Sequence, residues 1–418
     1  MRLSNAFLIP AALALLLAAP IGFTDSAAAK AATAPKAYVG LFKDNAVAVI
    51  DTGSDRVLGR VPVPTGPHGI VITPDGRWVF VSSDGDSKVS IIDTSSDSLV
   101  ASIEVGASPH GLAITPDGRL VLAAVFGASA VAFIDTASRQ VVARLPADNP
   151  HNIALSPDGR TAYVAVQKAG ALGLAVLDVP SRSQVGFVPL DKTPRALSVS
   201  PDGKSLYFTL AGSDAVQVLD TARRALVRQI PVGASPHLPL ATPDGKRVLV
   251  VSQGPGELYI LDAMQSTVSA HLSVGAQPHW IALTPDGRRA LVTDEGSNDV
   301  SLVDLGSLAK TGSIPVGNAP RKIAIQPAPL PAGPTASLTE IRAFAFAPDL
   351  KVEAGQALVW TNRDAVPHTV DADDGSWASG EIQSGGSFSR TFDRPGSYPY
   401  HCAVHPFMRG TLTVTGLL

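Results

Sequence analysis

The sequence predicts an all-β protein in two parts, a closed ring of repeated four-stranded sheets followed by a smaller β-sandwich. A short phrase recurs along most of the 418 residues, and the runs between its copies alternate apolar and polar residues. Such alternation is typical of half-buried strands. Near residue 330 the repeat stops, and a different series of strands leads to HCAVHPFM, His401 to Met408, which holds the only cysteine.

The N-terminal segment has the pattern of a targeting signal. MRLSN supplies a positive start, AFLIPAALALLLAAP is an apolar run, and small residues of the Ala-x-Ala type lie near Ala27. We therefore expect residues 1–29 to be a secretory signal peptide. The run is short for a membrane anchor and two prolines interrupt it. The mature chain is expected to be periplasmic or secreted, without a transmembrane anchor.

The repeated phrase is [TS]-P-D-G, with copies 41 to 44 residues apart. Proline presets φ and glycine accepts a positive φ, so the phrase predicts a tight turn in each unit. A second marker agrees, because an apolar run ending in aspartate recurs seven times. These strand-end aspartates are expected to cap turns through bonds to the backbone. They are Asp51, Asp93, Asp135, Asp178, Asp220, Asp262 and Asp304.

A unit of about 42 residues with four strands is typical of a β-propeller blade. One small twisted sheet cannot cover both its faces, but radially packed neighbours cover each other. Three strand-like runs precede the first full unit, and one, RKIAIQP, follows the last. Because these partial units are complementary, we expect residues 37–327 to close into a seven-bladed β-propeller. The segment resembles the YVTN-type repeat family, a likeness that indicates the fold and leaves the function open.

The start of each innermost strand carries a histidine or an arginine directly after proline. Seven equivalent starts should meet at one mouth of the central channel, and we call this set the His/Arg ring. Three interpretations stay open: a polar lining that holds water, a second metal site, or an anion site. Neutral imidazoles bind copper or zinc, whereas the two arginines favour an anion. The ring consists of His68, His110, His151, Arg195, His237, His279 and Arg321.

The last 80 or so residues form the second part. Residues 328–337 are rich in proline and predict a semi-stiff linker. Residues 338–418 then contain new strand-like runs, and Cys402 can form no internal disulfide because it is the only cysteine. A lone thiol in an oxidising compartment is a liability unless something occupies it.

Blue-copper sites take two imidazoles and a thiolate, with a long axial thioether. His368 follows the strand ALVWTN, while Cys402, His405 and Met408 lie in one turn between the last two strands. Together with WTNRDAVPHTV and RPGSYPYHC, this tail resembles the cupredoxin family, and its short ligand loop is most similar to the amicyanin and plastocyanin branch. The resemblance implies one type 1 copper held by these four residues. His401 should point to the opposite face, and the Thr369 hydroxyl should bond to the backbone of the ligand loop.

These features predict a copper-binding protein that transfers single electrons to an unknown redox protein, with the propeller as a docking or ligand-binding platform. The alternative is an enzyme whose active site is the His/Arg ring, either a copper-cluster oxidoreductase or a lactonase-like hydrolase. The domain order is similar to that of nitrous oxide reductase, but the second cysteine needed for its electron-entry centre is absent. No nucleic acid partner is expected, because 33 basic residues are spread among 36 acidic ones.

Overall fold

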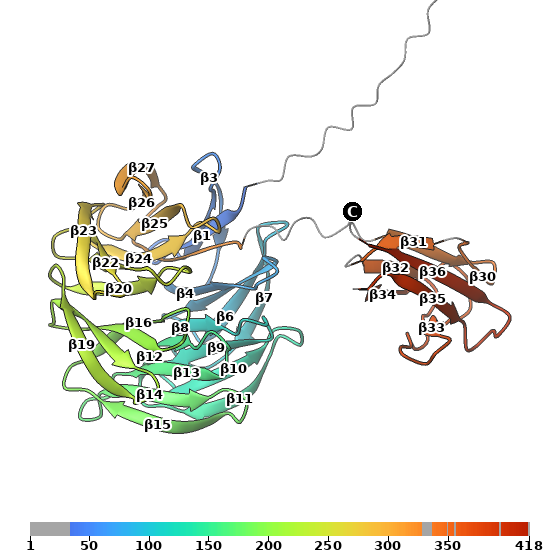
Figure 1. Ribbon diagram of the computed structural model, residues 1–418, viewed down its shortest axis with the longest axis horizontal. Coiled ribbons are helices and arrows are strands. Elements are labelled where there is room, and N and C mark those ends of the chain that lie inside the picture. The colour runs from blue at the N-terminus through green and yellow to red at the C-terminus, as the bar shows by residue number, and fades with distance from the viewer. Residues whose placement is uncertain (1–33, 328–336, 349, 355–356, 393, 417–418) are drawn as a thin grey trace, which may run out of the picture. The chain divides into compact units, whose positions relative to one another are not determined.

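The computed structural model describes residues 34–327, 337–348, 350–354, 357–392 and 394–416. The expected signal peptide and nearly all of the expected linker lie outside these ranges. The described residues form nine four-stranded sheets (Figure 1). None of these residues belongs to a helix of the length and apolarity needed to cross a bilayer.

Seven of the sheets form a β-propeller, which confirms the predicted fold class. The innermost strands are β4 (Pro67–Ile72), β8 (Pro109–Ile114), β12 (Pro150–Leu155), β16 (Pro194–Val199), β20 (Pro236–Ala241), β24 (Pro278–Leu283) and β28 (Pro320–Ile325). The second strands are β1 (Lys36–Leu41), β5 (Trp78–Ser83), β9 (Leu120–Val125), β13 (Thr161–Val166), β17 (Ser205–Leu210), β21 (Arg247–Ser252) and β25 (Arg289–Asp294). The third strands are β2 (Ala46–Asp51), β6 (Lys88–Asp93), β10 (Ala130–Asp135), β14 (Gly173–Asp178), β18 (Ala215–Asp220), β22 (Glu257–Asp262) and β26 (Asp299–Asp304). The outermost strands are β3 (Arg56–Pro62), β7 (Ser98–Glu104), β11 (Gln140–Pro146), β15 (Ser183–Pro189), β19 (Ala225–Pro231), β23 (Thr267–Ser273) and β27 (Ala309–Pro315).

The ring closes through a sheet that joins both ends of the repeat, in the order β28-β1-β2-β3. Strand β28 pairs antiparallel with β1, with Ala37 opposite Ile325. Beyond the paired residues, Gln326 N donates to Lys36 O at 2.8 Å. Each innermost strand contacts those of both neighbouring sheets, including β28 with β4. The predicted pairing of the first three strands with the last run is therefore confirmed.

Burial follows from the radial packing of the sheets. The second and third strands are buried on both faces, whereas the outermost strands alternate or lie largely exposed. The apolar clusters lie between adjacent sheets, so Val39 and Ile50 of the first sheet pack with Leu291 and Val300 of the last. Each interface therefore removes from water a face that a single sheet would expose.

The turns have the predicted chemistry. In the first [TS]-P-D-G turn, Gly76 has a φ of +71°, and Asp75 accepts a bond from Arg77 N at 3.0 Å. The strand-end aspartate Asp51 accepts bonds from the backbone N–H groups of Gly53 and Ser54. All seven strand-end aspartates make such bonds, which confirms their capping role.

The remaining two sheets form the β-sandwich. One has the order β30-β29-β32-β34 and the other β31-β36-β35-β33. Pairs β29 with β32 and β31 with β36 are parallel, and the rest are antiparallel. The strands are β29 (Ser337–Arg342), β30 (Ala345–Phe346), β31 (Leu350–Glu353), β32 (Ala357–Asn362), β33 (Asp371–Ala372), β34 (Ser387–Thr391), β35 (Gly396–His401) and β36 (Arg409–Thr415).

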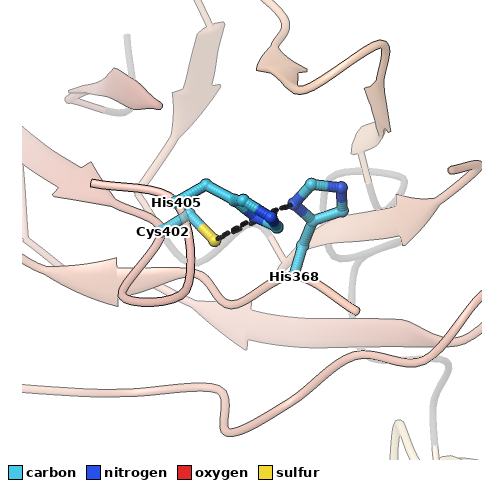
Figure 2. Close-up of side chains that lie close together, drawn as sticks. All are labelled: His368, Cys402 and His405. Atoms are coloured by element: carbon cyan, nitrogen blue, oxygen red, sulfur yellow. Dashed lines mark hydrogen bonds between the residues drawn. The ribbon is translucent and has the colours of Figure 1, made fainter. Parts of the chain in front are cut away.

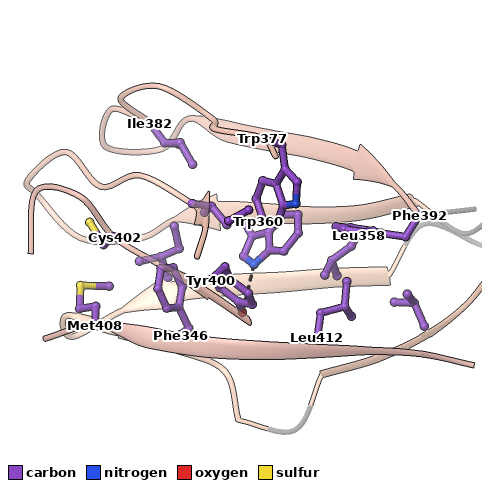
Figure 3. Packing of buried hydrophobic residues seen from close by; sticks show 14 of the residues in the cluster. Phe346, Leu358, Trp360, Trp377, Ile382, Phe392, Tyr400, Cys402, Met408 and Leu412 are labelled. Carbon is purple, nitrogen blue, oxygen red and sulfur yellow. Dashed lines mark hydrogen bonds between the residues drawn. The ribbon is translucent and has the colours of Figure 1, made fainter. Parts of the chain in front are cut away.

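The core of the sandwich is rich in aromatic side chains (Figure 3). Trp360 and Tyr400 are fully buried, and Trp360 Nε1 donates to the Tyr400 hydroxyl at 3.4 Å. At one end of this core lie the two sulfur-bearing side chains, Cys402 and Met408. The packed aromatic core therefore positions both sulfur atoms at the same end of the sandwich.

Candidate metal centre

His368 reaches the end of the sandwich from the segment between β32 and β33. A two-residue bridge fixes its backbone, since His368 N donates to Ile382 O at 3.2 Å and Ile382 N donates to His368 O at 2.7 Å. Its side chain is fully buried. A buried imidazole on a backbone held in this way has little freedom to move away from the site.

Cys402, His405 and Met408 lie together in the loop that joins β35 to β36. Backbone bonds close this loop, because Met408 N donates to His405 O at 2.8 Å and Cys402 N donates to Met408 O at 3.1 Å. Cys402 is fully buried, Met408 is 2% exposed and His405 is partly exposed. The tight spacing therefore presents three side chains to one point without an intervening segment.

The structure brings the two imidazoles and the thiol together (Figure 2). Cys402 Sγ lies 3.8 Å from His368 Nδ1 and 3.7 Å from His405 Nδ1, and the two Nδ1 atoms are 3.2 Å apart. Among the described residues, this is the one set of three His, Cys, Asp or Glu side chains whose ligand atoms all lie within 4.8 Å of one another.

This donor set fits copper. Two imidazole nitrogens and a thiolate around one point are the equatorial ligands of a blue-copper site, and Met408 supplies a thioether of the axial type. Both imidazoles direct Nδ1 toward the buried Cys402 sulfur, which is the arrangement that two nitrogen ligands and one thiolate ligand of a single ion require.

Asp364 orients His368, a role that the sequence analysis did not identify. Its Oδ2 lies 3.0 Å from His368 Nε2, on the side of the ring away from Cys402. A carboxylate there fixes the proton on Nε2 and leaves the Nδ1 lone pair for a metal. Bonds from Phe344 N, and then from Ala343 N, hold the pKa of Asp364 below its ordinary value. The available signal was an aspartate four residues before the ligand, in NRDAVPH.

Thr369 joins the two ligand segments, as predicted. Ala403 N donates to Thr369 Oγ1 at 2.7 Å, and Thr369 N donates to Cys402 Sγ at 3.2 Å. The expected bond from the hydroxyl to the ligand loop is thus confirmed. His401 instead lies against Asp373, with Nδ1 2.6 Å from Oδ1, and takes no part in the cluster.

An apolar surface surrounds His405. The Phe344 ring meets the His405 ring edge-on at 5.0 Å between centroids and the His368 ring at 5.5 Å. Phe344 and Val404 are each 43% exposed and Phe407 is 73% exposed. We call Phe344, Val404 and Phe407 the apolar rim. The one partly exposed imidazole of the site therefore lies within an apolar surface.

All members of the His/Arg ring line one pocket at the mouth of the channel, with a volume of about 350 Å³. Neighbouring imidazoles pack against each other at a tilt, with centroids 3.6 Å apart and planes at 38° for His68 and His110, and 4.0 Å and 36° for His237 and His279. Among the described residues, the ring histidines do not form a cluster of converging ligand atoms of the kind seen at Cys402.

A β-sandwich that holds a thiol, two imidazoles and a thioether at one end defines a cupredoxin, here preceded by a propeller. Sequence comparison agrees: copper binding proteins of the plastocyanin/azurin family match residues 336–415, and a YNCE-like beta-propeller family matches residues 26–117. Through its C-terminal part the chain belongs to the plastocyanin/azurin family of copper-binding proteins. Copper is therefore its cofactor.

The similar proteins divide between the two parts. Amicyanin-alpha of Methylorubrum extorquens is 36% identical over 90 residues, which are 20% of this chain and 74% of that protein. Amicyanin of Paracoccus denitrificans is 40% identical over 74 residues, 16% of this chain and 55% of that protein. The structure of Kuenenia stuttgartiensis hydrazine synthase has a TM-score of 0.60 and 21% identity, covering 65% of this chain and 92% of its own. At that identity the last likeness shows the fold alone.

Proposed function

We propose that this protein is a periplasmic or secreted electron-transfer protein that exchanges single electrons with another redox protein. In this proposal residues 1–29 are a signal peptide, 37–327 the propeller, 328–337 a linker and 338–418 the copper domain. The observation that carries the proposal is the buried cluster of His368, Cys402 and His405. Copper in such a site supplies one-electron redox chemistry between its two common oxidation states.

The surrounding residues suit electron transfer better than substrate turnover. Cys402 and His368 are fully buried and Met408 nearly so, which leaves no buried ligand position open to a substrate. Asp364 and Thr369 hold His368 and the ligand loop in place. A site whose ligands are fixed in advance reorganises little when its charge changes.

His405 is the ligand through which we expect electrons to enter and leave. It is partly exposed, and the apolar rim around it can bury against a partner of matching character. The partner we propose is a redox protein with an apolar surface at its own electron-transfer site. The propeller serves in this proposal as a platform that docks a partner or holds a ligand.

A redox titration of the copper-loaded full chain tests the proposal. We expect one copper per chain, with a visible absorption that is lost on adding one electron equivalent and restored by oxidation. Phe407→Ser should leave the absorption unchanged and slow electron exchange with protein partners. Val185→Ser is the control, because Val185 is also exposed and apolar but lies on the propeller, and it should not slow the exchange. Several coppers per chain, or a colour that does not respond to one electron, would contradict the proposal.

A further inference from the structure

A buried lysine lies below the His/Arg ring and was not singled out by the sequence patterns. Lys322 follows Arg321 on β28 and is 3% exposed. Its Nζ donates to Asn152 Oδ1 at 2.5 Å and lies 4.2 Å from the centre of the Trp280 ring. Asn152 and Trp280 each directly follow a ring histidine. Lys322 therefore belongs to a second layer of the channel, one residue deeper than the ring.

Lys322 has no carboxylate partner in the described part of the chain. Its ammonium group contacts the Asn152 amide and the Trp280 ring. Burial lowers the pKa of Lys322 to about 7. A buried ammonium without a counter-charge is costly, which is why buried charges are normally paired. An anion bound above Lys322 would supply such a counter-charge.

The ring above Lys322 is rich in groups that donate hydrogen bonds. His151 Nδ1 accepts from Asn152 Nδ2 at 2.9 Å, so the proton of that neutral ring resides on Nε2. The Nδ1 atoms of His68, His237 and His279 are buried without a partner. Leaving a buried donor unpaired is costly, so their protons also belong on Nε2, at the open edge of each ring. His110 differs, because its Nδ1 donates to His151 O at 3.2 Å and its Nε2 therefore carries no proton in the neutral ring. The other four imidazoles thus offer N–H groups to the pocket.

Two arginines at the mouth of the channel carry positive charge, as a protonated Lys322 does. Arg195 makes a bond to Ser235 Oγ at 3.2 Å and has no carboxylate contact among the described residues. Arg321 forms an ion pair with Glu295 at 3.1 Å, and Asp84 lies near enough for its charge to interact with that of Arg321. Cations outnumber carboxylates around the pocket. Burial, and to a smaller extent the nearby charge of Lys322, lowers the pKa of all five imidazoles.

We propose that the mouth of the propeller channel is a binding site for a small multivalent oxyanion, held by the Nε2–H groups of the ring and by Arg195 above the charge of Lys322. The two sources of this chemistry are a tetrahedral inorganic oxyanion and a small polycarboxylate. A pocket of about 350 Å³ accommodates either. A bound metal cation is disfavoured because Arg195 and Lys322 have no carboxylate partner among the described residues to offset their charge.

Calorimetric titration of the full-length Cys402→Ser chain with sulfate and with citrate, at matched ionic strength, tests the site. Cys402→Ser keeps copper out of the measurement, and sulfate keeps its charge across pH 6 to 8. We expect one anion per chain, with the preferred probe identifying the source. Sulfate affinity should rise toward pH 6 as Lys322 takes up a proton, because burial lowers the pKa of Lys322 to about 7. The imidazoles stay neutral over this range because burial lowers their pKa values well below the ordinary one. The carboxylates Glu295 and Asp84 weaken anion binding.

Two added substitutions separate binding from structure. Lys322→Met should weaken binding at least tenfold while raising the melting temperature without anion, since it removes an unpaired buried charge. Arg195→Gln should also weaken binding, whereas Lys204→Met, at a side chain that is 83% exposed, should not. No saturable binding of either probe, wild-type affinity in Lys322→Met, or zinc binding that is lost in His110→Ala with His237→Ala would each overturn the proposal.

Discussion

The two groups of histidines in this chain show what separates a metal centre from a ring of imidazoles. At the sandwich end, His368 and His405 point their Nδ1 atoms at one thiol, and a carboxylate holds the far side of His368. At the channel mouth, neighbouring imidazoles are tilted against each other, with two guanidiniums and a buried lysine nearby. A metal centre is therefore recognised by the convergence of its ligand atoms and by the sign of the surrounding charge, and not by the number of histidines.

The largest expected effect separates the two folds. Deletion of residues 37–63 removes most of β1 to β3, so β28 loses its partner and the ring opens. We expect the protein to lose the cooperative unfolding transition of the propeller and to aggregate through exposed strand edges, while any soluble fraction stays blue with copper. Circular dichroism melting and sedimentation check this. A deletion variant that stays soluble and unfolds cooperatively would show that the ring does not need this closure.

Removal of the thiol is the next largest change. Cys402→Ser should abolish the intense visible absorption of the copper-loaded protein, because Cys402 is the only thiol in the chain. The melting of the propeller should be unchanged. His401→Ala is the matched control, since that neighbour lies outside the ligand cluster, and it should remain blue. A blue Cys402→Ser protein would refute the assignment of the site.

Asp364→Asn tests the carboxylate that orients His368. An amide cannot fix the His368 tautomer as firmly, so we expect copper affinity to fall about 10- to 100-fold with the blue spectrum retained. Competition with a chelator measures the change. Asp374→Asn, at a surface turn of the same domain that caps Ser376 N, should leave affinity unchanged. An equal loss in both variants would mean that general charge, and not orientation of His368, is responsible.

The smallest expected effect of a single substitution is at the ring, where one histidine changes the pH dependence of stability. Burial lowers the pKa of His151 to about 3 and those of the other ring histidines well below their ordinary value. The unfolded chain therefore binds more protons than the folded chain below about pH 6.5. The free energy of unfolding should decrease as the pH is lowered, by up to about 1.4 kcal/mol per pH unit for each such group.

Urea unfolding of the Cys402→Ser chain at pH 7.5 and 5.5, without added anion, measures this dependence. His237→Gln should flatten it, while His271→Gln, at an exposed position on β23, should leave it unchanged. A slope that His237→Gln does not alter would show that this imidazole is not kept neutral by burial.

Local patterns in the sequence were enough to predict the blades, the closure of the ring and the set of copper ligands. The [TS]-P-D-G turns and complementary partial repeats predict the pairing of β28 with β1, and the spacing of Cys402, His405 and Met408 predicts one loop. Lys322 could not be recognised, because one lysine in an alternating strand ordinarily faces solvent. Its partner Asn152 is 170 residues away, and only closure of the ring brings the two together.

Asp364 and Phe344 escaped recognition for a related reason. Asp364 accepts bonds from the backbone of Ala343 and Phe344, and Phe344 packs against both imidazoles. These contacts join segments some 20 residues apart whose approach depends on the turn between β29 and β30. Composition and spacing carry no direct signal for such a turn, in which Ala343 and Phe344 both take positive φ.

The pairing of β28 with β1 also sets an order of events during synthesis. The chain emerges from its N-terminus, so β1, β2 and β3 exist long before residues 320–325 are made. Until then the inner edge of β1 presents unpaired N–H and C=O groups, an edge that can template association with another chain. Closing the ring joins segments almost 290 residues apart, which makes it a late step in assembly. During synthesis, six blades can therefore form while the seventh awaits its last strand, and over that period the edge of β1 stays open to pairing with another chain.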